Sequence, residues 1–194
     1  TDLKVGLADD HEWMGGASMA QNGVICNPNI PSEEVFTTPH SLRVEGYVSS
    51  TKPLSHQGTL IDNIRVVFEK GSITDAKASK GETVLKKVLE SDEGARRLGE
   101  VALVPNSSPI SNSGLLFYNT LFDENAACHI ALGQCYSKCF KGETNLSTSE
   151  IRERGGNSSM IHIDWMIGSG EIDIDGFGKN GEIVPIFRKG EWVD

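Results

Sequence analysis

The chain has 194 residues, of which 38% are hydrophobic and 23% charged, and its formal net charge is −9. This length and composition fit one domain with a sizeable core. The chain has only 18 lysines and arginines, which argues against a nucleic-acid partner because phosphate backbones are bound by clustered positive charge. It also has no apolar run of the roughly 18 residues that a membrane-spanning helix needs.

Short segments rich in β-branched residues and bounded by turn residues predict strands in much of the chain. They lie at residues 41–50, 61–71, 97–105 and 182–194. Lys70-Gly71 and Lys189-Gly190 are predicted to form hairpin turns. These segments predict a mainly antiparallel sheet system.

Two segments instead predict helices. Residues 81–99 place apolar side chains at helical spacing, and Gly94 is the expected stop. Residues 119–139 are small and apolar, which predicts a second, buried helix or helical turn. The expected fold class is therefore α+β, a mainly antiparallel β-sheet lobe with two or three helices.

The four cysteines predict reduced thiols in a cytoplasmic protein. Three of them crowd the segment CHIALGQCYSKC, at a spacing unlike the paired motifs of zinc or redox sites. Cys135 and Cys139 could share one face of the second predicted helix.

The stretch MIHIDWMIG, residues 160–168, combines a core-like apolar pattern with two polar residues. Side chains alternate faces along a strand, so His162 and Asp164 are predicted to point one way while Ile163 and Trp165 point into the core. A buried charge is costly unless it is paired or binds a metal. Two interpretations stay open at this point: a His–Asp hydrogen bond, or a cation shared by both side chains.

Other residues strengthen the metal interpretation. His129 follows Glu124, Glu100 interrupts an apolar strand, and Glu34 lies between Pro31 and Pro39 in a segment expected to be extended. Two histidines with three or four carboxylates suit Zn²⁺, Mn²⁺ or Co²⁺ better than a thiolate site would. So many anionic donors indicate two ions bridged by a carboxylate rather than one.

Four motifs resemble a known family. They are NIPSEEVFTTP, RLGEVALV, NTLFDENAACHIALG and SMIHIDWMIGSGEIDIDG, and they are similar to those of the thermophilic metalloaminopeptidases of the aminopeptidase T, aminopeptidase S and PepS type. The resemblance extends over residues 1–194 and implies the carboxy-terminal metal-binding catalytic domain. The first residue is Thr1, and the family's amino-terminal α/β lobe is expected to lie outside this chain.

The resemblance implies a cytoplasmic, homodimeric exopeptidase with two divalent ions (Zn, Co, Mn or Mg), whose substrates are peptides with a free N-terminus. The metal ligands that it implies are Glu34, Glu100, Glu124, His129, His162 and Asp164. It places Tyr136 at the catalytic centre, where a phenol can donate a hydrogen bond to a developing oxyanion. Glu100 is the candidate to carry a proton from water to the leaving amine, with Glu34 as a competitor.

Two other functions remain open. The lobe could hold metal and bind peptides or partners without turnover, being inactive without its amino-terminal half. A metal-dependent amidase would instead hydrolyse substrates that lack a free α-amine.

Several other motifs are explained without function. Residues 171–182, EIDIDGFGKNGE, match five positions of a calcium-binding EF-hand loop, but Glu171 stands where aspartate is required and the flanks alternate like strands. A β-hairpin with an acidic outer face is expected there. The glycines of the same segment fit a dinucleotide-binding pattern, but no helix is predicted to follow it. A thiol hydrolase built on Cys128 is disfavoured because its neighbour His129 is expected to point away.

Overall fold

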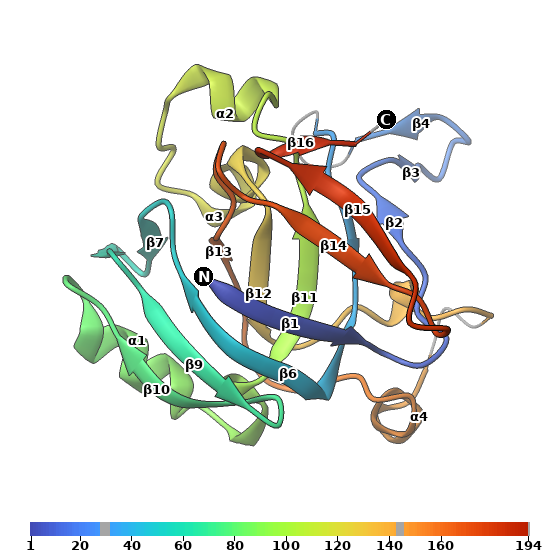
Figure 1. Cartoon of the computed structure of the whole chain (residues 1–194), viewed down its shortest axis with the longest axis horizontal. Coiled ribbons are helices and arrows are strands. Elements are labelled where there is room, and N and C mark those ends of the chain that lie inside the picture. The colour runs from blue at the N-terminus through green and yellow to red at the C-terminus, as the bar shows by residue number, and fades with distance from the viewer. Residues whose placement is uncertain (28–31, 143–145, 194) are drawn as a thin grey trace.

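A computed structural model describes residues 1–27, 32–142 and 146–193 of the chain. Within them, antiparallel sheets predominate and the helices are short, so the predicted α+β class is confirmed (Figure 1). Pro31, which was predicted to extend the segment before Glu34, lies outside the described residues. None of the described helices is long and apolar enough to cross a membrane.

The first sheet has four antiparallel strands in the order β1-β6-β9-β10. Their bounds are β1 Asp2–Leu7, β6 Pro39–Ser49, β9 Arg65–Glu69 and β10 Ser72–Lys77. Lys70 and Gly71 both have positive φ, at 50° and 78°, as a two-residue turn between twisted strands requires. This confirms the first predicted hairpin.

Helix α1, Glu82–Leu89, packs on this sheet through its buried Leu85 and Leu89. The predicted stop at Gly94 is wrong, because the helix ends five residues earlier. The Asp92 side chain accepts a hydrogen bond from the Ala95 backbone N–H and starts a separate 3₁₀ turn, η1, Glu93–Arg96. Gly94 lies inside that turn, where an added Cβ would collide with the backbone of Ser158.

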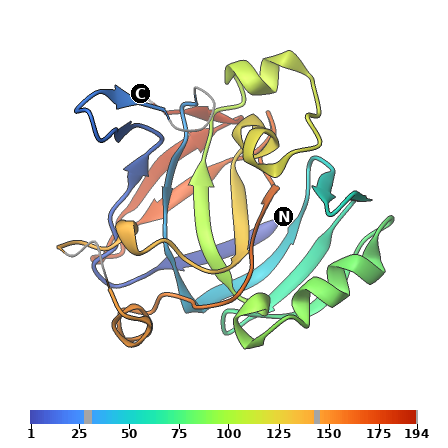
Figure 2. The ribbon, with the colours of Figure 1, turned by 180° about the vertical axis from the view of Figure 1, so that it is seen from behind.

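The second sheet holds the candidate site and has the order β13-β12-β11-β5-β2 (Figure 2). Its strands are β13 His162–Met166, β12 His129–Gly133, β11 Leu98–Leu103, β5 Val35–Thr37 and β2 Met14–Gly15. One face supplies Leu98, Ile130, Leu132, Ile163 and Trp165 to the main core, which also contains Val44, Val66 and Phe68 of the first sheet. The two sheets therefore enclose the core. The other face of the second sheet carries the polar side chains of the candidate site beside a small apolar cluster of Phe36, Ala102 and Cys139.

The second predicted helix, over residues 119–139, is wrong for most of its length. Only α3, Thr120–Asp123, and two 3₁₀ turns, η2 Glu124–Ala126 and η3 Ser137–Cys139, are helical there. The middle of the segment is β12, a central strand with all five residues buried. A short apolar run fits a buried strand as well as a buried helix, and pairing on both sides decides for the strand. Cys135 and Cys139 therefore share no helix face.

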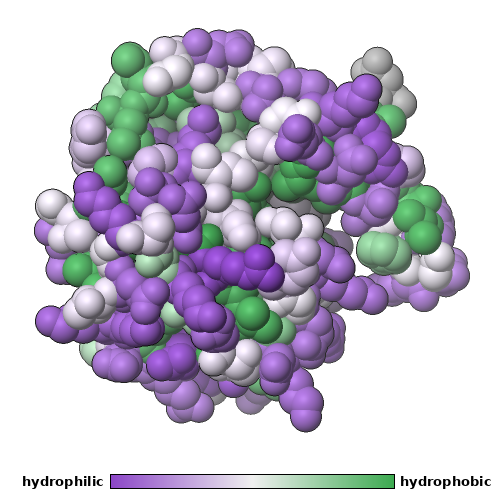
Figure 3. All heavy atoms as spheres, turned by 60° about the vertical axis from the view of Figure 1, so that its left-hand side comes forward, coloured by the Kyte–Doolittle hydropathy of each residue, from purple (hydrophilic) through white to green (hydrophobic). Residues whose placement is uncertain are grey.

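The remaining elements surround these two sheets. The third sheet, β14 Ile174–Phe177, β15 Ile183–Arg188 and β16 Glu191–Trp192, is antiparallel. It confirms the predicted hairpin over residues 171–182 and the turn at Lys189-Gly190. The other elements are the strand pairs β3 Ser18–Met19 with β4 Ile25–Cys26 and β7 Leu54–His56 with β8 Thr59–Ile61, and the helices α2 Pro109–Ser113 and α4 Thr148–Glu153. On the face drawn in Figure 3, apolar residues form separate patches among polar ones.

Candidate metal centre

The predicted donor residues lie on or beside the strands of the second sheet. They are Glu34 just before β5, Glu100 on β11, Glu124 in η2, His129 on β12, and His162 and Asp164 on β13. Ala131 of β12 pairs with Glu100 on one side and with Asp164 on the other. Directly paired residues point to the same face of a sheet, so these three side chains form a row. Ala131 and Gly133 are small, which leaves room above β12 for the larger side chains to converge.

The donor atoms approach one another closely. Nε2 of His129 lies 2.9 Å from Oε1 of Glu34 and 3.6 Å from Oε1 of Glu100. Nε2 of His162 lies 3.6 Å from Oε2 of Glu100 and 3.4 Å from Oδ1 of Asp164. Glu100 thus presents one carboxylate oxygen to each imidazole and lies between the two histidines.

The donors form three overlapping groups, in each of which the ligand atoms lie within 4.8 Å of one another. The groups are Glu34, Glu100 and His129; Glu100, His162 and Asp164; and Glu124, His129 and Asp164. Each group has one imidazole and two carboxylates, a donor set that suits zinc, manganese or cobalt.

Backbone carbonyl groups orient both imidazoles. Nδ1 of His129 donates to the Ala127 carbonyl oxygen at 3.0 Å, and Nδ1 of His162 donates to the Gln134 carbonyl oxygen at 2.7 Å. When the rings are neutral, these bonds leave the Nε2 lone pairs directed at the carboxylates. Metal-binding histidines are oriented in this way by a partner on the other ring nitrogen.

Burial makes the cluster costly without a bound cation. Glu100, His129 and Asp164 are all buried. Nε2 of His129 and Oδ1 of Asp164 have no hydrogen-bond partner among the described residues, although both lie at ion-pair distance from neighbours. Unpaired buried polar atoms are unfavourable. A divalent cation would satisfy these two atoms and offset the carboxylate charge, so the residues present fit such an ion.

The pKa values describe the same crowding. Burial, followed by the negative charge of Asp164, raises the pKa of Glu124 to about 9. Burial lowers the pKa of His162, but the hydrogen bond and charge of Asp164 outweigh it and raise that pKa to about 9. Burial also raises the pKa of Glu100. Without metal, the cluster therefore retains protons at neutral pH.

Tyr136 follows β12 and lies beside the cluster. Its ring centroid is 4.7 Å from that of His162 and 5.9 Å from that of Phe36. Burial and then the negative charge of Glu100 raise the pKa of the phenol, so it stays protonated as a hydrogen-bond donor. Because the side chain is 42% exposed, a substrate can reach it.

Asp123 and Glu124 are neighbours in the chain with different surroundings. The Asp123 carboxylate accepts hydrogen bonds from the backbone N–H groups of Phe117 at 2.7 Å and Asn119 at 3.0 Å. It therefore holds the loop between α2 and α3. Glu124 instead belongs to the donor group with His129 and Asp164.

Sequence reasoning missed the groups that support the donors. The Ala127 and Gln134 carbonyls leave no side-chain signal. Gly99, which precedes the donor Glu100 on β11, does leave a signal in the sequence, because a glycine within a strand often marks a bulge. The β11–β12 register does shift between Leu98 and Glu100.

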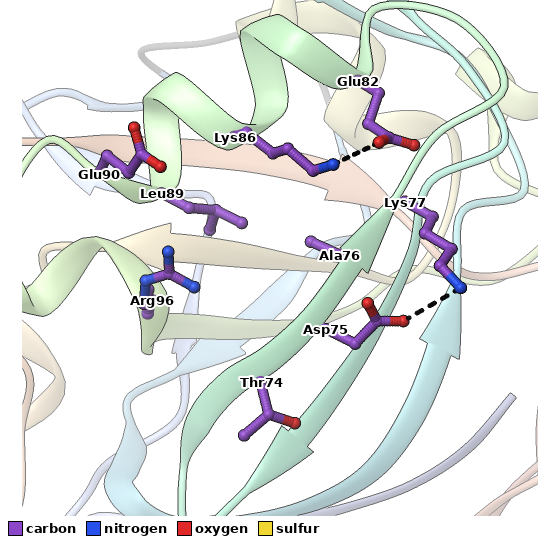
Figure 4. Close-up of a pocket in the computed structure, with 9 residues that line it drawn as sticks. All are labelled: Thr74, Asp75, Ala76, Lys77, Glu82, Lys86, Leu89, Glu90 and Arg96. Atoms are coloured by element: carbon purple, nitrogen blue, oxygen red, sulfur yellow. Dashed lines mark hydrogen bonds and ion pairs between the residues drawn. The ribbon is translucent and has the colours of Figure 1, made fainter.

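The hollow between α1 and β10 does not resemble this centre (Figure 4). Four of its charged residues form two ion pairs: Nζ of Lys86 lies 2.5 Å from Glu82, and Nζ of Lys77 lies 3.7 Å from Asp75. Its lining has no histidine or cysteine. The hollow therefore lacks the mixed imidazole and carboxylate donors of the candidate centre.

Known proteins match the whole of this chain. The family described as Thermophilic metalloprotease (M29) matches residues 1–192. Aminopeptidase T of Thermus aquaticus is 55% identical over 193 residues, and Aminopeptidase 2 of Geobacillus stearothermophilus is 53% identical over 189 residues. These matches cover 100% and 97% of this chain but 47% and 46% of the relatives. The chain thus spans about half the length of the curated relatives it matches.

The fold agrees with these matches. The solved structure of wild-type AmpT from Thermus thermophilus matches with a TM-score of 0.93 and 53% sequence identity, covering 100% of this chain and 47% of that chain. A family match over nearly every residue, relatives above 50% identity and a shared fold lead to one conclusion: the chain belongs to the thermophilic metalloprotease (M29) family.

Proposed function

We propose that this chain forms the metal-binding catalytic lobe of an aminopeptidase, which removes residues from the N-termini of peptides. Membership in a metalloprotease family implies a divalent metal, and relatives from several bacteria are named aminopeptidases. The observation that supports the proposal most strongly is the Glu100 carboxylate, whose two oxygens face two imidazoles that are both fixed through Nδ1.

We propose two ions, zinc, cobalt, manganese or magnesium. Glu34, Glu100 and His129 would hold one, and Glu100, His162 and Asp164 the other, with Glu124 as a further ligand. Bound there, divalent cations would make a water molecule more acidic and polarise the scissile carbonyl. A cation bound there would also favour the unprotonated form of a free α-amine, a group that peptides with a blocked N-terminus lack.

Side chains of this lobe would supply the remaining chemistry. Tyr136 is protonated and accessible, so its hydroxyl can donate a hydrogen bond to the oxyanion that forms from the scissile carbonyl. A carboxylate must accept a proton from the attacking water and pass it to the leaving amine. Glu100 remains our candidate and Glu34 its competitor. Both oxygens of Glu100 already face imidazoles, so a base at Glu100 would also have to serve as a ligand.

The direct test combines metal content with turnover. Glu34→Gln and His162→Ala should each lower bound metal, measured by inductively coupled plasma mass spectrometry, and abolish hydrolysis of leucine p-nitroanilide. Glu33, the exposed residue before Glu34, provides the control. Glu33→Gln should change neither the metal content nor the rate of hydrolysis. The assignment fails if Glu34→Gln and His162→Ala behave like that control.

A second function is supported by the length of the chain, which is about half that of its relatives. The lobe could bind metal and peptides yet need further residues for turnover. Bound metal without hydrolysis by this chain, together with hydrolysis by a protein of full family length, would favour this alternative. Hydrolysis of N-acetylated substrates would instead favour a metal-dependent amidase.

Two further proposals rest on the family resemblance alone: a homodimer and a cytoplasmic location. Light scattering of the purified protein at several concentrations tests the first, and fractionation of its source cells tests the second.

A further inference from the structure

Lys138 lies in η3, two residues after Tyr136, and its ammonium covers the aromatic rim of the candidate centre. Nζ is 4.7 Å from the centroid of the Phe36 ring and 5.3 Å from that of the Tyr136 ring. A cation over an aromatic face is attracted by the ring's negative π surface. The two rings therefore favour one position of a long, flexible side chain.

This ammonium has unused binding capacity. Across residues 1–27, 32–142 and 146–193 it takes part in no ion pair or hydrogen bond; its contacts there are the two ring faces. An ammonium group has three donors, and ring faces satisfy none of them as an oxygen anion would. Because the rings have already restricted the side chain, binding an anion costs less conformational entropy.

Lys138 also lies within reach of a bound peptide. Two consecutive distances, 4.7 Å from the His162 ring to the Tyr136 ring and 5.3 Å from that ring to Nζ, place the ammonium within about 10 Å of the His162 imidazole. An extended peptide advances roughly 3.3 to 3.6 Å per residue. A group one or two residues beyond a scissile bond held beside Tyr136 can therefore reach Nζ.

The charges around Lys138 indicate which kind of substrate group its ammonium would bind. Glu34, Glu100, Glu124 and Asp164 lie together behind the aromatic rim, so an incoming anion meets a negative potential unless cations offset it. Metal ions would offset the ligand charges at the centre, and Lys138 adds a positive charge farther out. Every peptide with an unmodified C-terminus carries a carboxylate there.

We propose that Lys138 binds a carboxylate of the substrate one or two residues beyond the scissile bond, and so favours dipeptides and tripeptides with a free C-terminus. An acidic side chain at the same distance presents the same chemistry. The proposal rests on the proposed peptidase function and specifies its substrate class. Lys138 is a specificity residue in it and takes no part in the bond-breaking step.

The test compares Leu-Gly, Leu-Gly-amide and Leu-Asp-amide with metal-loaded protein. The wild type should cleave Leu-Gly with a kcat/KM about fivefold above that of Leu-Gly-amide, the effect of one ion pair at a partly exposed rim. Lys138→Gln should abolish the preference and leave cleavage of Leu-Gly-amide unchanged. The matched control is Lys141→Gln, which removes a nearby exposed lysine and should keep the preference. A preference for Leu-Asp-amide as well would add acidic side chains to the substrates bound.

Three results would overturn the proposal. The wild type could show no preference, Lys141→Gln could abolish it equally, or Lys138→Gln could slow Leu-Gly-amide by the same factor. The last result would mean that Lys138 acts through the Tyr136 ring. Failure of the proposed function is distinguishable, because none of the three substrates would then be cleaved. Calorimetric binding of a reduced-bond Leu-Gly analogue, as free acid and as amide, would still decide the role of Lys138.

Discussion

Gly99 lies directly against the backbone of Gln134: a Cβ at Gly99 would come within 2.6 Å of the Gln134 carbonyl carbon. The oxygen of that carbonyl accepts the 2.7 Å hydrogen bond from Nδ1 of His162. The missing side chain on β11 therefore helps to determine the orientation of an imidazole on β13.

Gly99→Ala should displace the Gln134 carbonyl and loosen His162. We expect weaker metal binding and a loss of about 1 to 3 kcal/mol in the free energy of unfolding, typical of an overpacked site. Metal titration and urea unfolding measure the two effects. Gly15→Ala is the control, since a Cβ added there would meet no atom of the described residues within 4 Å. Unchanged metal affinity in Gly99→Ala would contradict the proposed link.

Tyr136→Phe should lower kcat for leucine p-nitroanilide by about 100-fold, as removal of one oxyanion donor does in other hydrolases. The phenol has a raised pKa and stays protonated, which makes it a poor metal ligand, so bound metal should stay at the wild-type level. Tyr118→Phe, at an exposed tyrosine, should leave kcat unchanged. Loss of metal in Tyr136→Phe would instead make the tyrosine a ligand or a support for one.

Metal uptake should release protons. In the metal-free protein Glu124 and His162 both have a pKa of about 9, so at pH 7 both hold a proton that a cation must displace. Apparent affinity should therefore rise between pH 7 and pH 9 and level off above it. Calorimetry in two buffers of different ionisation enthalpy measures the protons released. Glu124→Gln should release about one proton fewer; an equal number would show that Glu124 is not displaced.

Asp92 should stabilise the fold in a pH-dependent way. Its pKa lies below the ordinary value of 3.8, chiefly because it accepts a 2.6 Å hydrogen bond from the Met160 backbone N–H, helped by Ser159 and Ala95. A lowered folded pKa contributes stability above the unfolded pKa, and this contribution is lost as pH falls through the folded value.

Asp92→Asn should accordingly cost about 1 kcal/mol at pH 7, less than a hydrogen bond to a fully buried charge because solvent screens this carboxylate. The cost should shrink as the pH falls below the ordinary carboxyl pKa of 3.8. Urea unfolding of the metal-free wild type and variant, at pH 7 and at a pH well below 3.8, tests this. A difference that stays constant with pH would exclude the ionised carboxylate as its cause.

The alternation of β13 could be predicted from sequence because a two-residue period is a local property. His162 and Asp164 do lie on one face, while Ile163 and Trp165 enter the core. The segment containing His129 could not be assigned in this way. His-Ile-Ala-Leu-Gly is compatible with a buried helix, and only its pairing with both neighbouring strands makes it β12.

The contact between Glu34 and His129 likewise could not be predicted from the spacing of residues in the sequence. These residues are far apart in the chain, and their 2.9 Å approach depends on how β5 and β12 lie in the sheet. The family resemblance named both residues, but no local pattern predicted their contact. The carbonyls of Ala127 and Gln134 were invisible for another reason, since every residue type has a carbonyl.

The two faces of β13 affect how the sequence of this strand can change during evolution. Ile163 and Trp165 alternate with His162 and Asp164 along a single backbone. A core substitution that changes side-chain volume would therefore shift this backbone and, with it, the positions of the donor atoms. Selection for thermal tolerance and selection for metal preference would then act on the same strand from opposite sides. Exchanging Ile163 for a larger or smaller residue should change which cation binds best, although that side chain never contacts it.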